Sequence, residues 1–258
     1  MGLDEGIGGG WYETGDRQEL RETREIREFS ELAEGETDYE CIKEICVEQV
    51  DSLEGLGEEP VLVTGSPFEM AEELDCRQGD NKFQAASDCG LVSCSNFLKI
   101  CGVEADEDEI VEFALEQNLC GHSPFQSPQE WGGTDDRCLE TILESYGVES
   151  SVYYPRELRG SIEGIADAVE EGHAAMIGVN AGYLWNEPGA VGDGCANHQI
   201  TVTGTVRDSS GELAALTICD SGRHLDSDSC RVVPVAELES CYANVSGASV
   251  ILSDQAVR

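Results

Sequence analysis

Residues 84–90 read QAASDCG and lead directly into a segment with strong apolar periodicity. After Cys89, apolar side chains recur at helical spacing and predict a helix over residues 89–101 with one buried face, formed by Leu91, Cys94, Phe97, Leu98 and Cys101. A cysteine at a helix start can be held as a thiolate, because the helix N-terminus carries partial positive charge and unpaired N–H groups. Gln84 lies just upstream and is placed to direct its amide at an oxyanion beside Cys89. We interpret Cys89 as a candidate nucleophile and Gln84 as its oxyanion donor.

A histidine and an aspartate belong to a predicted hairpin further along the chain. Residues 197–204 read NHQITVTG and place His198 at the mouth of an alternating, β-branched strand. A turn and a returning strand follow, so pairing of the two strands brings Asp220 close to His198. A carboxylate there holds the imidazole in one tautomer while the other ring nitrogen takes the proton from Cys89. The order Gln, Cys, His, Asp therefore predicts a cysteine-nucleophile active site.

These segments resemble a known family. The DCG core at Cys89, with Cys94 on the same helix, is similar to the active-site helix of the bacteriocin-processing (double-glycine leader) cysteine peptidases of the papain-like superfamily. The His198 strand and residues 218–222, ICDSG, resemble that family's histidine and aspartate strands. The resemblance covers residues 77–253 and implies a papain-like fold. It implies these roles: Cys89 as nucleophile, His198 as base, Asp220 as orienting residue and Gln84 as oxyanion donor.

A looser similarity concerns the segment between the two halves of the predicted site. Residues 182–186, GYLWN, and 192–196, GDGCA, resemble stand-alone papain-like modules of bacterial toxins and effectors. We interpret Trp185 and Asn186 as a substrate-facing loop, with packing in the core as the alternative. The chain shows no transmembrane or nucleotide-binding segment, so an exporter-linked leader peptidase is not directly supported.

The charge of the chain restricts its partners. There are 53 acidic against 15 basic residues, a formal net charge of −38. Such a chain repels nucleic acid and anionic membranes, so neither is an expected partner. The expected partner is a peptide or protein substrate. The acidity favours a solvated surface adapted to high salt, and the alternative is a face for a basic protein or peptide.

Export and metal signals are also missing from the sequence. No apolar run approaches the ~20 residues of a membrane span. The N-terminus has neither a basic stretch nor an apolar core, so we expect a cytoplasmic protein, or one exported without a conventional signal peptide. The 12 cysteines include no C-x-x-C pair, so most are expected to be free thiols, with no metal site and no cofactor.

The chain divides into three predicted regions. Residues 1–35 form a disordered or loosely helical extension, residues 36–76 a helix–strand–helix extension, and residues 77–258 the papain-like catalytic domain. In the second region we predict a helix from Thr37 that carries Val50 on its apolar face. A strand over 61–64 and a helix over 66–75, opened by a capping box, complete that region. The extension is expected to regulate the site.

Helices dominate the first half of the catalytic region, and strands the second. The predicted helices cover 89–101, 106–118, 135–146, 161–171 and 236–241. The predicted strands cover 148–154, 174–179, 199–206, 213–220, 231–233 and 249–252. This order predicts an α+β fold, in which a helical lobe that carries the nucleophile packs on an antiparallel sheet lobe. Cys89 and His198 then face each other across the join.

Three function hypotheses follow. The leading one is a papain-like cysteine hydrolase that cleaves a peptide or isopeptide bond. The second keeps the thioester chemistry in a bacterial effector or toxin that acts as a glutamine deamidase, transglutaminase or acyltransferase. The third is a catalytically silent papain-like binding module, which requires Cys89 and His198 to be misaligned. His122 and His173 compete with His198 for the role of base, and His224 is a candidate pocket wall.

Overall fold

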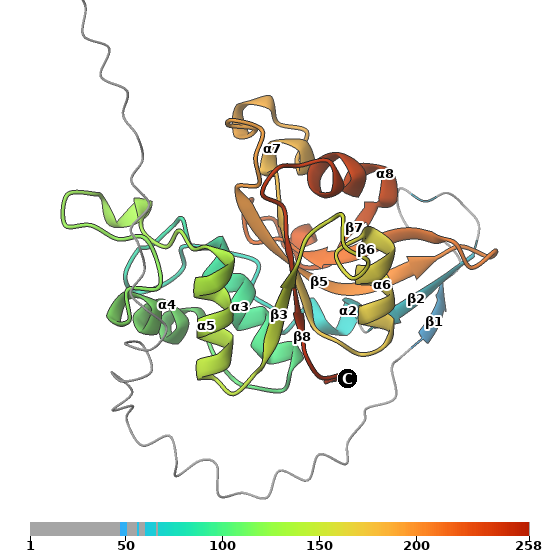
Figure 1. Ribbon diagram of the computed structural model, residues 1–258, viewed down its shortest axis with the longest axis horizontal. Coiled ribbons are helices and arrows are strands. Elements are labelled where there is room, and N and C mark those ends of the chain that lie inside the picture. Colours follow the sequence, from blue (N-terminus) through green and yellow to red (C-terminus); the bar gives the residue numbers. More distant parts are fainter. Residues whose placement is uncertain (1–46, 51–55, 57–59, 66, 258) are drawn as a thin grey trace, which may run out of the picture. The chain divides into compact units, whose positions relative to one another are not determined.

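The computed structural model of the chain describes residues 47–50, 56, 60–65 and 67–257. They belong to one compact unit. Within it, helices pack against a mostly buried antiparallel sheet (Figure 1). The fold is therefore α+β, with the helices of the nucleophile region on one part of the sheet, as the sequence predicts.

The described strands form one antiparallel sheet that branches at β5. Six strands follow one another in the order β1 (Val47–Val50), β2 (Val61–Gly65), β5 (His198–Arg207), β4 (Ala175–Val179), β8 (Val250–Ser253) and β3 (Ser150–Tyr153). Two more extend from β5: β6 (Leu213–Cys219) pairs with β5, and β7 (Arg231–Pro234) pairs with β6. In the register of β4 and β5, Val179 lies opposite His198. In that of β5 and β6, Thr201 lies opposite Cys219. The start of β5 thus lies near the end of β6.

Three of the four long helices in the described residues begin after a residue whose side chain caps them. The longest ones are α3 (Cys89–Ile100), α4 (Glu107–Glu116), α5 (Asp136–Ser145) and α6 (Ile162–Glu170). The short ones are α2 (Pro67–Met70), α7 (Ala181–Leu184) and α8 (Val235–Leu238), with a π-helical turn over Glu239–Ala243. Three-residue or five-residue 3₁₀ turns cover Pro128–Glu130, Pro188–Ala190 and Asp226–Cys230. Asp106, Asp135 and Ser161 cap α4, α5 and α6 by accepting a backbone N–H of the first turn.

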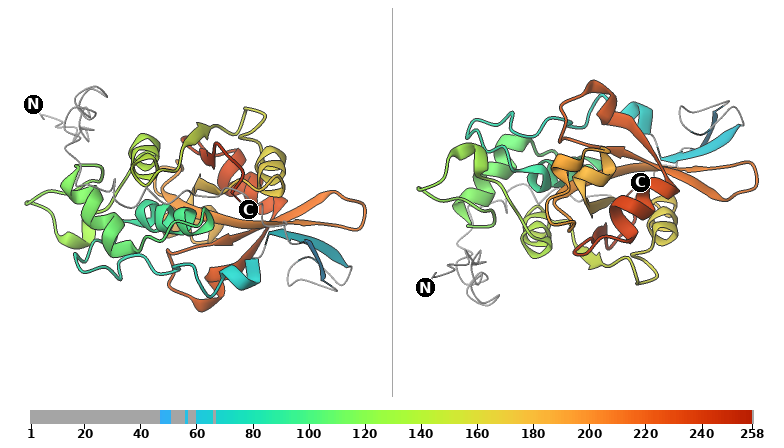
Figure 2. Two further views of the ribbon diagram at one scale, coloured as in Figure 1. Left: turned by 90° about the horizontal axis from the view of Figure 1, so that it is seen from below. Right: turned by 90° about the horizontal axis from the view of Figure 1, so that it is seen from above.

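The two largest apolar cores lie on opposite faces of the sheet, because Met176 of β4 belongs to one and its neighbour Ile177 to the other. Figure 2 shows the green helices α3, α4 and α5 gathered at one end of the unit and the orange β5–β6 hairpin extending at the other. The first core lies among those three helices and includes Phe97, Ile110 and Leu139. The second lies between the sheet and α6 and includes Ile165 and Ile200. Because α3 packs against β5, the helix that carries Cys89 is fixed to the strand that carries His198.

The structure corrects one predicted element. The helix predicted from Thr37 is wrong at residues 47–50, which form β1 and pair with β2, with Val47 opposite Thr64. The alternation of valine with polar residues in VEQV suits a strand, and pairing with β2 outweighs the helical spacing of the wider segment. The predictions for residues 1–46 lie outside the described residues. The predicted helix over 66–75 is shorter, because α2 ends at Met70.

The strand predicted over 61–64 is confirmed as β2, and it belongs to the main sheet. It pairs with β5, where Gly65 lies opposite Gly204. A Cβ at Gly204 would stand 2.4 Å from the carbonyl oxygen of Thr64, so only glycine allows the two strands to approach this closely. The division of the chain between residues 76 and 77 stays a prediction.

Candidate active site

Cys89 is the first residue of α3. The helix is buried along almost its whole length, whereas Cys89 at its start is a half-buried residue with a free thiol. At this end the helix packs against the loop before α5, where a Cβ at Gly90 would stand 2.2 Å from the Thr134 hydroxyl oxygen. As the first residue of the helix, Cys89 has a backbone N–H with no partner in the preceding turn. The thiol and this N–H therefore lie together at the positive end of the helix.

His198 and Asp220 come from neighbouring strand ends. His198 opens β5, and Asp220 directly follows β6. The His198 Nε2 atom and the Asp220 Oδ1 atom are 2.7 Å apart, and the two side chains are 4% and 0% exposed. Because Nε2 is engaged with the carboxylate, Nδ1 is the nitrogen left to serve the Cys89 thiol.

Three further groups contact the Asp220 carboxylate, and the most distant is the Arg231 guanidinium, 4.0 Å from Oδ2. The indole Nε1 of Trp185 donates to Asp220 Oδ2 at 2.7 Å, and the backbone N–H of Gly222 donates to Oδ1 at 2.9 Å. The Trp185 ring also lies against the His198 ring, with centroids 5.1 Å apart. A Cβ at Gly222 would stand 2.4 Å from the Trp185 ring, so glycine makes room for this contact. The carboxylate is therefore fixed from several directions.

The electrostatics of these groups favour an ion pair between Cys89 and His198. Burial raises the pKa of the Cys89 thiol, but the charge and hydrogen bond of His198, with backbone N–H groups at Gln199 and Gly90, hold it below its ordinary value. Burial lowers the pKa of His198, but its interactions with Cys89 and Asp220 raise it to about 10. For Asp220, burial is outweighed by bonds from His198, Trp185 and Gly222, which lower the pKa to about 2. All three shifts thus favour the charged forms: thiolate, imidazolium and carboxylate.

Gln84 lies on the loop that leads into α3. Its side chain is exposed, and its Oε1 accepts from the Gln129 amide at 3.4 Å. Its φ of 58° lies in the left-handed region, which a non-glycine residue adopts at a cost. Because the Gln84 oxygen accepts this bond, the Gln84 Nε2 group is the end of the amide that can donate to another group. The oxyanion role stays a prediction.

The other histidines have different surroundings. His173 is buried, and its Nδ1 lies 2.7 Å from the Ser253 carbonyl oxygen. The His122 Nδ1 lies 3.2 Å from the Cys120 carbonyl oxygen. His224 is exposed, with φ of 58°. Of the four histidines, His198 is the one whose charge acts on the Cys89 thiol.

The five buried thiols in the described residues differ from Cys89 in their electrostatics. Burial raises the pKa of Cys94 and Cys219 well above the usual range. It is also the main cause that raises the pKa of Cys120, Cys138 and Cys241 to about 12. In the described part of the chain, no group of three or more His, Cys, Asp or Glu residues could hold a metal ion. Of the helices in the same part, none has the length and apolar character that crossing a membrane requires.

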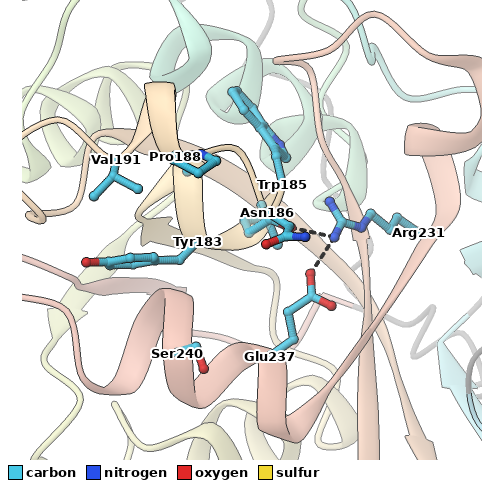
Figure 3. A pocket seen from close by; sticks show the side chains of 10 residues that line it. Tyr183, Trp185, Asn186, Pro188, Val191, Arg231, Glu237 and Ser240 are labelled. Atoms are coloured by element: carbon cyan, nitrogen blue, oxygen red, sulfur yellow. Dashed lines mark hydrogen bonds and ion pairs between the residues drawn. The ribbon is translucent and has the colours of Figure 1, made fainter.

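A cavity of about 600 Å³ is lined in part by Trp185, whose indole contacts Asp220 (Figure 3). Arg231 lies on one side of it, where its guanidinium donates to the Leu184 carbonyl oxygen at 2.6 Å and pairs with Glu237. Tyr183 forms part of the opposite side. Asn186 is exposed and lines the cavity, whereas the polar end of Trp185 is engaged by Asp220.

Sequence reasoning missed several residues around the site. It did not assign the Trp185 indole to Asp220, nor a role to Gly222. It also missed Asn81, which donates to both the buried Asp88 carboxyl group next to Cys89 and the Glu107 carboxyl group. The available signal for Gly222 was its place two residues after Asp220, in a turn. The others have no local signal, because the contacts join segments that are distant in the sequence.

The chain was compared with known proteins. No protein-family model matches it. Three uncharacterized proteins, one from Mycobacterium bovis and two from strains of Mycobacterium tuberculosis, are 26% identical to it over 141 residues. The match covers 47% of this chain, which thus spans 60% of the length of each relative. Among solved structures, the chain is similar to a double glycine motif protease from an AMS/PCAT transporter in complex with the leader peptide. That similarity has 15% identity and a TM-score of 0.38, and covers 66% of this chain and 86% of the other.

Proposed function

We propose that the chain is a papain-like cysteine hydrolase that cleaves a peptide or isopeptide bond through Cys89, His198 and Asp220. One observation carries the proposal. The buried His198 ring is held by Asp220 at 2.7 Å and at the same time interacts with the Cys89 thiol at the start of α3. A nucleophile, a base and an orienting carboxylate in this relation are the components of covalent acyl transfer.

In the proposed first step, the Cys89 thiolate attacks the substrate carbonyl carbon and the carbonyl electron pair moves to its oxygen. Collapse of this intermediate expels the amine, which takes the proton from His198 and leaves an acyl-enzyme thioester. In the second step His198 takes a proton from water, the resulting hydroxide displaces the thiolate, and the acid leaves. Asp220 keeps the ring oriented and stabilises its charged form throughout.

The backbone N–H of Cys89 and the Gln84 amide are the proposed donors to the oxyanion. The N–H of the first helical residue has no intrahelical acceptor, which supports this assignment. A positioned donor of this kind contributes about 3–4 kcal/mol to transition-state stabilisation. The contact with Gln129 uses the Gln84 Oε1 atom, so the proposed donor is the Nε2 group of the same amide.

Mass spectrometry of intact protein tests the nucleophile. Wild-type protein is incubated with a peptide that carries a thiol-reactive electrophile, alongside Cys89→Ala and the matched variant Cys94→Ala, which removes a buried thiol of the same helix. We expect one adduct on wild type and on Cys94→Ala, and none on Cys89→Ala. Adducts distributed over several thiols, or retained in Cys89→Ala, would contradict the proposal.

A peptide library then tests the reaction. Each sequence is supplied in a basic and an acidic version, because the net charge of −38 favours cationic peptides near the surface. We expect new peptide termini that depend on Cys89. Conversion of glutamine to glutamate, or transfer to an added amine, would instead favour a deamidase or transglutaminase. A reactive Cys89 with no turnover of any library member would favour a binding module.

A further inference from the structure

The carboxyl group next to the nucleophile forms a buried acid pair. Asp88 directly precedes Cys89 and is completely buried, and Glu107, the first residue of α4, is 6% exposed. The Asn81 side-chain amide donates to Asp88 Oδ2 at 3.0 Å and to Glu107 Oε1 at 2.8 Å. One amide nitrogen of Asn81 thus contacts both carboxyl groups, which makes them buried neighbours. A bond between two carboxyl groups requires a proton on one of them.

Asp88 does not use its carboxyl group as a helix cap. Asp106 and Asp135 stand at the same position before α4 and α5, and their side chains accept backbone N–H groups at 2.9 and 2.8 Å. Asp88 makes no such bond to α3, and its Oδ1 atom is buried without a donor. A buried carboxylate oxygen without a donor is costly. Protonation removes this cost, because an O–H group can donate to Glu107.

The surroundings of the pair favour the protonated form. Burial, followed by the hydrogen bond and charge of Glu107 and the charge of Cys89, raises the pKa of Asp88 to about 9. Burial also raises the pKa of Glu107, with Asp75 adding to the effect and Asp88 and Asn81 opposing it. Cys120 is a further titratable group that senses the Asp88 charge. A neutral Asp88 also spares the Cys89 thiolate a negative neighbour.

We propose that Asp88 and Glu107 share one proton, and that this acid pair is the positioning element for the loop that carries Gln84 and Cys89. The pair anchors the loop at several points. Glu107 Oε1 accepts the Gly79 backbone N–H at 3.0 Å. Asn81, held by both carboxyl groups, accepts the Ala85 backbone N–H at 3.0 Å. The inference rests on the proposed role of Cys89, and it assigns to Asp88 the role of positioning Cys89.

The shared proton makes stability depend on pH in a particular direction. The folded chain keeps a proton on Asp88 up to pH about 9, whereas an ordinary carboxyl group loses it near 3.8. The stabilisation is complete below pH 3.8, declines as the pH rises towards 9, and is lost beyond that. Above this range two adjacent carboxylates repel, and the loop loses its anchor.

The test compares Asp88→Asn, Asp88→Ala and Glu107→Gln with wild type. An amide at either position donates to the remaining carboxylate without a titrating proton, whereas alanine removes the contact. Glu116→Gln, an exposed change at the other end of α4, is the matched control. The melting temperature is measured from pH 5 to 10, and the rate of Cys89 alkylation by iodoacetamide at pH 7 is followed by mass spectrometry.

The difference in melting temperature, Asp88→Asn or Glu107→Gln minus wild type, should increase from pH 5 to about 9 and stay constant above that pH. Glu116→Gln should follow wild type throughout. In Asp88→Ala, Cys89 should be alkylated about tenfold more slowly than in wild type. This loss is smaller than the ~10²-fold that a displacement of about 1 Å can cost. In Asp88→Asn the rate should lie within about threefold of wild type.

Two results would overturn the inference. Parallel melting curves for wild type, Asp88→Asn and Glu107→Gln would exclude the shared proton. Equal alkylation rates for Asp88→Ala and wild type would exclude the positioning role. Failure of the proposed function is distinguishable, because Cys89 would then not be the preferred thiol even in wild type, while the melting curves would still report on the proton.

Discussion

Asp88 and Asp220 are both completely buried, yet their pKa values shift in opposite directions. Asp220 receives donors from His198, Gly222 and Trp185, and its pKa falls to about 2. Asp88 faces a second carboxyl group, receives one amide donor, and its pKa rises to about 9. Burial is common to both, so the donors and charges around each carboxyl group decide its ionisation.

Both aspartates affect the Cys89 thiol, Asp220 through His198 and Asp88 as its neighbour in the chain. The charge of Asp220 stabilises the His198 imidazolium, and that imidazolium lowers the pKa of Cys89. A charged Asp88 would work against this effect, because it directly precedes the thiol in the chain. Both aspartates therefore favour the Cys89 thiolate. The negative charge of Asp220 supports the neighbouring imidazolium, and a neutral Asp88 does not repel the thiolate.

Removal of the imidazole should have the largest effect. His198→Ala should lower turnover by about 10²–10⁴-fold, the usual contribution of a general acid–base group. It should also raise the pKa of Cys89, because the main opposing charge is lost. Steady-state kinetics and the pH dependence of alkylation measure the two effects, and His173→Ala is the matched control. If His173→Ala were the damaging change, the assignment of the base would be wrong.

Neutralising Asp220 should have the next largest effect, and a pH dependence opposite to that of Asp88→Asn. The low pKa of Asp220 contributes about 2 kcal/mol of stability above pH 3.8, and this is lost as the pH falls through about 2. Asp220→Asn should therefore be less stable than wild type at neutral pH, and approach it in acid. Chemical denaturation from pH 2 to 7 measures the difference. A constant difference in stability over this range would contradict the lowered pKa of Asp220, and with it the contrast between the two aspartates.

Gly222→Ala tests whether the donors around Asp220 must be closely packed. The added methyl group would stand 2.4 Å from the Trp185 ring and 3.0 Å from His198 Cε1. Overpacking of this kind costs about 1–3 kcal/mol. Stability and turnover should fall together, whereas Gly189→Ala, where the added Cβ meets nothing within 4 Å, should change neither. Wild-type turnover in Gly222→Ala would argue against a tightly held carboxylate.

Trp185→Phe should give the smallest effect, because it removes one donor and keeps a ring against His198. The loss of a single hydrogen bond costs about 1 kcal/mol, and two donors to Asp220 remain. The alkaline limit of turnover, set by the His198 pKa, should move to lower pH as the ion pair weakens. Trp131→Phe removes an indole donor to the Ser123 carbonyl oxygen and serves as control. An equal loss in both variants would point to general packing.

Local patterns predicted much of the fold and the placement of the two strand-end residues. Apolar spacing after Cys89 identified α3, and the β-branched alternation after His198 identified β5, because both patterns repeat within a few residues. The segment at Val47–Val50 was misread, since its pairing with β2 is not encoded locally. The bond between Trp185 and Asp220 and the acid pair at Asp88 were out of reach for the same reason. They join side chains that only the tertiary fold brings together.

The branching of the sheet at β5 also predicts the order in which the parts of the site unfold. This strand has partners on both edges and is buried along nearly its whole length, so its amide protons should exchange with deuterium only through global opening. The first turn of α3 lies at a helix end, where exchange through local fraying is easier. At low urea concentrations the thiol should therefore lose its environment while the centre of β5 stays protected. Inactivation would then precede unfolding, with the nucleophile as the first part of the site to fail.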